Sequence, residues 1–289
     1  MTSKKEVNYE IDYLGALRAI LETYEEIAAS RMGRIRTSVL KSRDFLFEIN
    51  AIFQEVKSSY KDEVGLLMKR KKIHNPKELT FLNRNGKTLF VLISANTGFY
   101  GEIVRRTYNL FLENLKKEKV LDVMIIGRLG YEFFEAEKIN VPHSFFDLPD
   151  DRIDKDQLKI IVEKIIQYQK VLVFYEQFNN VINQTPIITN ISGDPLSYEK
   201  EGPRVKYFFE PTLEKIMAFF EKEIVASIFE QTILESELAK FAARMVALDA
   251  STDNTKKKLK QVLFQKERLK HRQGNKEQIE KFASMLLWR

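Results

Sequence analysis

The sequence predicts an α/β protein in which long N- and C-terminal helices form an antiparallel coiled coil and the middle of the chain forms a Rossmann-like α/β domain. Two observations support this prediction. Apolar residues recur at helical spacing for many turns at both ends, whereas the middle alternates short apolar runs with amphipathic segments. We expect three parts: a first shaft helix in residues 1–70, the α/β domain in residues 71–205, and a second shaft helix in residues 206–289.

The first helix is predicted over residues 10–57, which contain no proline. Such a helix would be roughly 70 Å long at about 1.5 Å per residue. A small globule cannot bury that length, so the helix needs a partner helix along most of its course. The apolar positions that would face this partner are Val7, Ile11, Leu14, Leu21, Ala28, Met32, Ile35, Val39, Leu46, Ile49, Phe53 and Val56.

The middle of the chain has a different period. A basic turn is expected at residues 69–76. Short apolar runs bounded by turn residues predict buried strands at residues 89–95, 123–127 and 171–175. One or two further strands are expected between Phe178 and Ile191, with a turn near Asn183 and an antiparallel last pair. Helices are expected at residues 101–119, 129–137 and 155–167, which gives the alternation typical of a parallel or mixed sheet.

The final helix is predicted to follow a linker at residues 192–211 and to start at Pro211, because proline suits the first turn of a helix. It would be roughly 110 Å long if straight, with Arg272–Gly274 as a possible interruption. Its apolar stripe alternates spacings of three and four, as in the seam of a coiled coil. The stripe runs through Leu234, Leu238, Phe241, Met245 and Leu248, and resumes at Leu259 and Val262 after a polar gap at Thr252 and Thr255.

Composition excludes several kinds of site. The chain has no cysteine, so it holds neither a disulfide nor a thiolate metal site, and its three histidines are too scattered to ligate a metal. No apolar run approaches the roughly 20 residues that cross a bilayer, and the start MTSKKEVNYEID lacks the apolar core of a secretory signal. No catalytic triad or carboxylate pair stands out. We expect no metal, no cofactor and no direct membrane insertion.

Three glycine-containing segments could bind phosphate, but turns are the preferred interpretation of each. Asn85–Thr88 contains Gly-Lys-Thr, yet it precedes a strand, whereas a phosphate loop follows one. Asn96–Gly101 follows a strand and could hold an anion at a helix N-terminus. Gly127–Gly130 is equally nonspecific.

The net charge is +6, and residues 256–272 contain eight basic residues and one acid. This stretch is interpreted as a solvated helix face, a nucleic-acid-binding face, or a basic shaft end surrounded by other subunits.

Residues 242–254 read AARMVALDASTDN. The polar residues Ser251–Asn254 alone would indicate a helix end followed by a new N-cap. The absence of glycine and proline from residues 213–273 instead favours one continuous helix. This segment resembles the C-terminal helix of the γ subunit of F1-type rotary ATPases, whose pattern is close to AARMVAMDNATDNA. Ile27–Met32 is similar to that family's VAASKM, and Arg272-Gln273 falls where the family carries an Arg-Gln pair.

The resemblance implies a non-catalytic central shaft that couples ATP hydrolysis or synthesis in an α3β3 ring to rotation. It implies α- and β-like subunits as partners, with an ε-like subunit and a membrane ring as further ones, and a peripheral cytoplasmic location at the inner face of the membrane. Partner contacts would be polar at Arg272 and Gln273, and apolar at Met285, Leu286, Leu287 and Trp288. Small or apolar residues would pack the shaft at Ala28, Ala29, Met32, Ala242, Ala243, Met245 and Leu248.

Two segments depart from the family pattern. The loop at residues 94–102 reads SANTGFYGE in place of SxDRGLCGG, with Tyr100 at the cysteine position, and residues 16–24 lack the family's lysines. These departures favour an F1-like motor with another output, for example a gliding machine, over a standard ion-coupled synthase. The alternatives are an α/β enzyme with a ligand at residues 96–101 and a nucleic-acid-binding coiled coil that uses residues 256–272.

Overall fold

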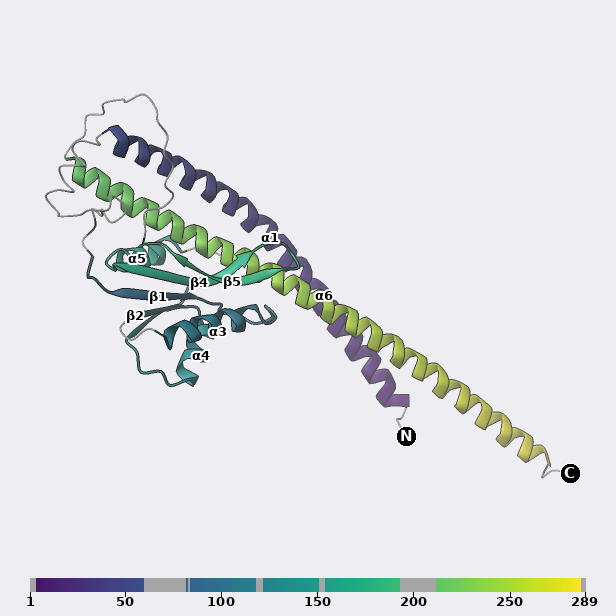
Figure 1. Ribbon diagram of the computed structural model, residues 1–289. Coiled ribbons are helices and arrows are strands. Elements are labelled where there is room, and N and C mark those ends of the chain that lie inside the picture. The colour runs from purple at the N-terminus through teal and green to yellow at the C-terminus, as the bar shows by residue number, and fades with distance from the viewer. Residues whose placement is uncertain are drawn as a thin grey trace. The chain divides into compact units, whose positions relative to one another are not determined.

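The computed structural model describes residues 4–59, 82, 84–117, 122–150, 154–192 and 212–286. Two helices are much longer than the rest, α1 (Lys4–Ser59) and α6 (Leu213–Leu286) (Figure 1). The chain divides into a helical unit, Met1–Ser30 with Arg244–Arg289, and an α/β unit, Arg31–Ala243. Both helices contribute to both units. The expected basic turn at residues 69–76 and nearly all of the expected linker lie outside the described residues.

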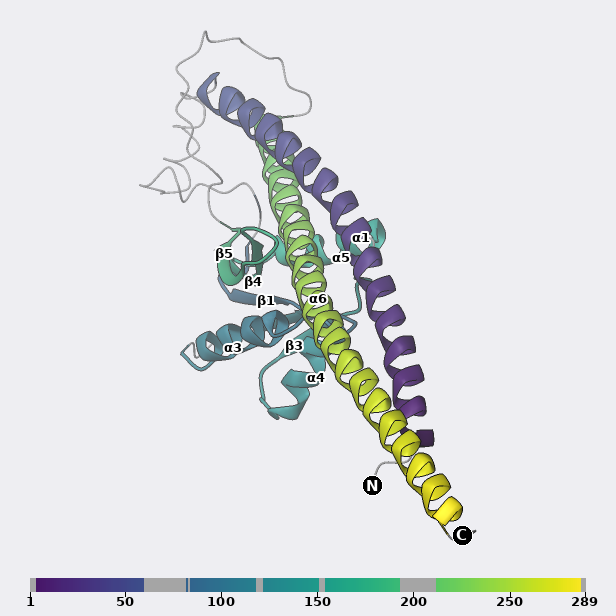
Figure 2. The same cartoon turned by 90° about the vertical axis from the view of Figure 1, so that its right-hand side faces the viewer.

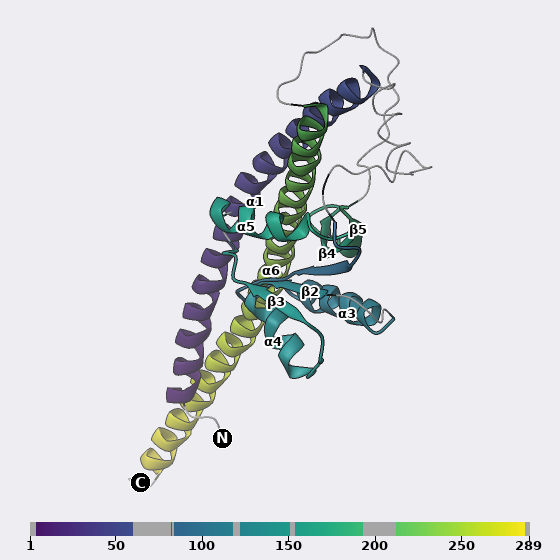
Figure 3. The same ribbon diagram turned by 90° about the vertical axis from the view of Figure 1, so that its left-hand side faces the viewer.

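In the helical unit, the first part of α1 and the last part of α6 lie side by side (Figures 1, 2 and 3). Val7 and Leu14 of α1 pack with Val262 of α6. In the α/β unit, Phe53 and Val56 near the end of α1 pack with Met217 near the start of α6. Each unit therefore contains an antiparallel helix pair, as predicted. Every apolar position predicted to face a partner along α1 is buried or half-buried.

The sheet of the α/β unit has five strands in the order β3-β2-β1-β4-β5. The bounds are Thr88–Ile93 for β1, Asp122–Ile126 for β2, His143–Phe146 for β3, Lys170–Phe178 for β4 and Gln184–Asn190 for β5. The first four strands are parallel, and β5 pairs antiparallel with β4, as expected for the last pair. Strand β3 was not predicted, because four alternating residues at a sheet edge form no apolar run.

Helices cover both faces of this sheet (Figure 1). Alternate residues of β1 point to opposite faces of the sheet, and each set belongs to a different hydrophobic core. Leu89, Val91 and Ile93 pack with Ile161 of α5 (Lys155–Ile165) and Phe229 of α6. Phe90 and Leu92 pack on the other face, beneath α3 (Ile103–Leu115) and α4 (Arg128–Ala136), which supply Tyr108, Phe111 and Phe134. The period-two alternation of a strand thus places one layer of helices on each face.

No helix in the described part of the chain is long and apolar enough to cross a membrane.

Phe174 lies at the centre of the core beneath α3, and its ring centroid is 5.0 Å from that of Phe90 and 5.3 Å from that of Phe111. We expect Phe174→Ala to lower the free energy of unfolding by about 3–5 kcal/mol, because it leaves a cavity among fully buried rings. Phe219→Ala is the matched control, since Phe219 is 59% exposed, and it should cost less than about 1 kcal/mol. Denaturant titration of the purified chain measures both. Equal losses would contradict this description of the core.

Candidate functional site

The buried stripe of α6 continues without a break through residues 242–254. The positions Leu234, Leu238, Phe241, Met245, Leu248, Thr252, Thr255, Leu259 and Val262 are all buried or half-buried and alternate spacings of four and three. Helix α6 is continuous through Ser251–Asn254, so these residues form no new N-cap, and it also continues through the possible interruption at Arg272–Gly274. Sequence spacing alone located this stripe. The polar gap expected at Thr252 and Thr255 lies within it, because both threonines are buried.

Local hydrogen bonds explain how polar residues fit into this helix. Ser251 Oγ donates to Ala247 O and Thr255 Oγ1 donates to Ser251 O, each at 2.8 Å. Hydroxyls that bond to the carbonyl of the preceding turn do not compete for the amides of a helix start. Thr252 is different. Its hydroxyl is buried and has no hydrogen-bond partner within the described residues.

The proposed shaft-packing residues divide by burial. Ala28 in α1 and Ala242, Ala243 and Leu248 in α6 are buried, Met32 and Met245 are half-buried, and Ala29 is exposed. Ala243 packs with Tyr100, Ile103 and Val104 of the α/β unit, so its burial does not arise from packing between the two long helices. Ala29 is exposed and has no packing contact of this kind among the described residues.

Ion pairs flank the seam of the helical unit. Lys256 of α6 pairs with Glu22 of α1 at 3.3 Å, and Lys258 pairs with Glu10 at 3.7 Å. Part of the basic stretch at residues 256–272 therefore makes contacts within the chain and is not wholly available to a polyanion.

From Lys270 onward, α6 has no cover from the described residues. Every side chain from Lys270 to Met285 is exposed, including the large apolar residues Ile279, Phe282 and Met285. Arg272 and Gln273 lie on this stretch, and Gln273 Nε2 donates to Glu277 Oε1 at 3.3 Å. Leu286 ends the helix, whereas Leu287 and Trp288 lie outside the described residues.

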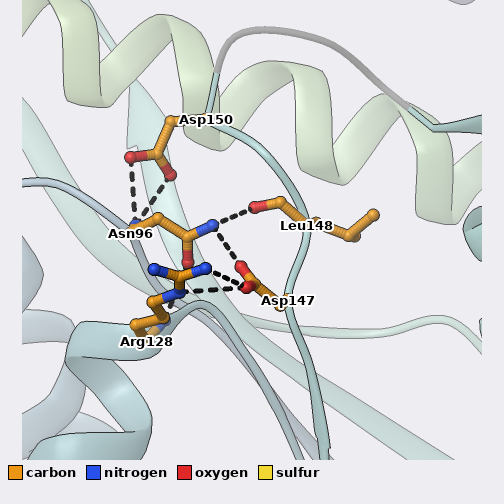
Figure 4. Close-up of polar contacts among 5 residues, drawn as sticks. All are labelled: Asn96, Arg128, Asp147, Leu148 and Asp150. Carbon is orange, nitrogen blue, oxygen red and sulfur yellow. Dashed lines mark hydrogen bonds and ion pairs between the residues drawn. The ribbon is translucent and has the colours of Figure 1, made fainter.

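The carboxyl edge of the parallel strands carries a polar cluster (Figure 4). Asn96, after β1, donates from its side chain to Asp147 Oδ1 at 2.6 Å and to Leu148 O at 2.7 Å. Its own Oδ1 accepts from the amide of Arg128 at 2.8 Å. The Arg128 guanidinium in turn lies 2.6 Å from Asp147 Oδ2. The side-chain amide of Asn96 thus donates two hydrogen bonds and accepts one, and these bonds tie three loops together.

The anion-binding capacity of the loop after β1 is already used by the chain. The backbone amides of Asn96 and Thr97 and the hydroxyls of Thr97 and Tyr100 all donate to the Asp150 carboxylate, at 2.9–3.1 Å. A phosphate would have to displace this carboxylate. The geometry is that of a structural turn, as the sequence favoured.

Close packing explains the glycines that follow β2. Gly127 has φ +99°, and a Cβ there would lie 2.8 Å from the amide nitrogen of Ala95. A Cβ on Gly130 would lie 2.7 Å from Cβ of Ser94. The two glycines let the start of α4 approach the loop after β1, a structural role that the sequence could not assign.

Buried polar groups lie where α6 meets the sheet, and sequence reasoning did not identify them. Glu176 at the end of β4 and Lys240 of α6 are both buried. Burial raises the pKa of the Glu176 carboxyl, and the charge of Lys240 opposes that shift. Glutamate in an otherwise apolar strand was the only available hint. No group of three or more acidic or histidine side chains that could hold a metal occurs within the described ranges.

Comparisons of the sequence and of the structure with known proteins both find ATP synthase subunits. A sequence model of the ATP synthase family matches residues 3–279. The chain is 22% identical to the ATP synthase gamma chain of Halothermothrix orenii, with 88% of each chain covered, and 27% identical to that of Cytophaga hutchinsonii, with 90% of each covered. Among solved structures, it matches a chain of the central stalk and c-ring of Tetrahymena thermophila mitochondrial ATP synthase. That match has a TM-score of 0.55 and 18% identity, and it covers 80% of this chain and 99% of that chain.

The unpartnered hydroxyl of Thr252 makes a prediction about the seam. Thr252→Val should raise the free energy of unfolding by about 1 kcal/mol, because it replaces a buried hydroxyl lacking a partner by a methyl group. Thr255→Val is the matched control and should be neutral or destabilising, since it removes the bond to Ser251 O. Denaturant titration of both variants tests this pair. A destabilised Thr252→Val chain would show that the hydroxyl is satisfied.

Proposed function

Because the chain belongs to the ATP synthase γ-chain family and is a non-catalytic rotor subunit, we propose that it is the central shaft inside an α3β3 ring of nucleotide-binding subunits. In this role residues 1–70 and 206–289 form the shaft, and residues 71–205 form the domain that turns with it. The shaft couples ATP hydrolysis or synthesis in the ring to rotation.

The coupling needs no catalytic group on this chain. An asymmetric helix pair presents a different face to each ring subunit, and each orientation favours a different conformation of each subunit. A ligand or partner shifts such an equilibrium only through its differential contact energy with the states. Rotation and nucleotide binding are then linked reciprocally. The orientation of the shaft changes the conformational equilibrium of each ring subunit, and the conformation of each ring subunit changes the preferred orientation of the shaft.

The observation that carries this proposal is the exposed end of α6. A helix whose apolar side chains have no cover from its own chain suits a surface that other chains enclose. We assign Met285, Leu286, Leu287 and Trp288 to an apolar bearing within the ring. Arg272 and Gln273 supply polar, directional contacts to a β-like subunit, and arginine suits this role because its guanidinium presents several fixed donors.

The relatives bear on the output of the motor. Those reported above are named as ATP synthase gamma chains, and they give no support to the sequence-based preference for a gliding-associated machine. We therefore propose an ion-coupled ATP synthase, with an ε-like subunit and a membrane ring as further partners. The chain would then lie at the inner face of the membrane, held there through the complex.

The two other functions considered from the sequence are not favoured. For an α/β enzyme, the loop that would hold a ligand at residues 96–101 has its donors engaged by Asp150. For a nucleic-acid-binding protein, Lys256 and Lys258 are paired with Glu22 and Glu10.

Affinity purification of the tagged chain from its own cells tests the proposal. We expect α- and β-like ATPase subunits to co-purify, together with a proteolipid ring. Recovery of the ring subunits without a proteolipid would support a shaft with another output. Recovery of the chain alone under gentle conditions would contradict the shaft itself.

A double substitution tests the polar contacts. Arg272→Ala with Gln273→Ala should lower ATP hydrolysis by the purified complex by about tenfold or impair its assembly, a loss of roughly 1.4 kcal/mol for a contact made in one orientation. Lys276→Ala is the control, since that side chain is 78% exposed and lies on the same stretch of α6. Unchanged assembly and turnover in the double variant would remove these residues from the ring contact.

A further inference from the structure

Several polar side chains are buried where the middle of α6 passes the carboxyl edge of the sheet. Glu176 ends the apolar part of β4, and Ser236 and Lys240 lie one turn apart on α6. Glu176 and Ser236 are fully buried, and Lys240 is 4% exposed. All three belong to the α/β unit. Charged side chains are almost never buried to this extent unless they have a partner.

The contacts of these side chains join the helix to two strand ends. Ser236 Oγ donates to Glu176 Oε2 at 2.5 Å. Lys240 Nζ donates to Ser94 O, directly after β1, at 2.7 Å. The charge of Lys240 also acts on the Glu176 carboxyl and opposes the effect of burial on its pKa. One helix is thus tied by hydrogen bonds to the ends of the central strand β1 and its neighbour β4.

Two further polar contacts hold α6 near the sheet: Tyr175 of β4 donates to Glu235 Oε2 at 3.5 Å, and Arg84, before β1, pairs with Glu221 at 2.7 Å. Most of the other described contacts between α6 and the sheet are apolar. Val225, Phe229 and Ile233 of α6 pack into the core that α5 also covers. Apolar contact is non-directional and depends mainly on the area removed from water. Side chains of similar size can therefore re-form a comparable interface after the helix rolls or slides. A buried hydrogen bond cannot, because a displaced donor or acceptor is left without a partner.

We propose that Glu176, Ser236 and Lys240 form a register lock that stops α6 from turning or sliding against the sheet when torque passes between the helix and the α/β domain. This inference rests on the proposed rotor function and adds the residues that transmit its load. Replacing a buried charged network by apolar residues is often neutral or stabilising. We explain the buried network here by its hydrogen bonds, which fix the position of α6 on the sheet, and not by a contribution to the free energy of unfolding.

The absence of cysteine from the chain allows a direct test by rotation. Ile182→Cys creates a single attachment site, because Ile182 is 83% exposed at the tip of the β4–β5 hairpin. The loop around it is held by its own hydrogen bonds, from the amides of Ile182 and Asn183 to Asn180 Oδ1. A bead attached there reports rotation of the α/β domain while the nucleotide-binding ring is fixed to a surface.

The decisive variant is Glu176→Leu with Lys240→Met in the Ile182→Cys background. It removes both charges while keeping apolar volume, so assembly, thermal midpoint and ATP hydrolysis without load should stay close to those of the parent. The stall torque on large beads should fall by about half or more, because the helix can then slip. Lys240→Arg, which keeps the charge and the donor, should retain more torque than the double variant.

Lys222→Met is the matched control. Lys222 also joins α6 to the α/β layer, through Glu163 of α5 at 3.8 Å, but both side chains are well exposed. Its torque should equal that of the parent. If the double variant also matches the parent, the other contacts between α6 and the sheet carry the load and the lock is wrong.

Two further outcomes also decide the question. If the double variant fails to assemble, Ser236→Ala takes its place, and undiminished torque in that variant would overturn the lock. Failure of the parent complex to rotate at all would refute the proposed function, and so is distinct from failure of the lock.

Discussion

The fold depends on covering the apolar stripe of α6. Helices within proteins gain most of their stability from packing of an apolar face and not from intrinsic propensity. Within the α/β unit α6 is covered by α1 and by the sheet, and within the helical unit by α1. Beyond Leu269 no described residue covers it, and its apolar side chains there are exposed. The surroundings of this one helix thus change along its length from a domain core, to a paired helix, to an uncovered end.

Polar groups mark the places where apolar packing is insufficient. The seam tolerates Thr255 because its hydroxyl bonds to the preceding turn. The sheet contact instead buries Glu176 and Lys240, whose desolvation is unfavourable unless each finds a partner. Such groups contribute little to net stability, but they distinguish one arrangement of a helix on a sheet from its neighbours. This distinction matters mechanically in a protein that must carry load. A helix held only by buried apolar area has many positions on the sheet of nearly equal free energy.

Periodicity predicted the long helices, the antiparallel pairing and four of the five strands, because these features repeat along the sequence. It could not predict β3, whose four residues repeat too briefly, nor the burial of Thr252 and Thr255, because hydropathy classes threonine as polar. The contacts of Asp150, Glu176 and Lys240 join residues more than fifty positions apart. Their partners are set by tertiary packing, for which local pattern has no signal. The exposed end of α6 was found from a resemblance, and its lack of cover became visible only in three dimensions.

The loop after β1 shows why a departure from a family pattern need not indicate a new function. Its unusual residues suggested a motor with a different output. In the structure Asn96, Thr97 and Tyr100 all donate hydrogen bonds to the Asp150 carboxylate. Asn96 also donates to Asp147, which accepts from Arg128 at the start of α4. The tyrosine hydroxyl belongs to this network, so its place in the loop is explained by a contact within the domain. Residues that satisfy one another in this way can change together while the surface they support keeps its role. The altered loop is therefore evidence about local packing, and the output of the motor must be decided by its partners.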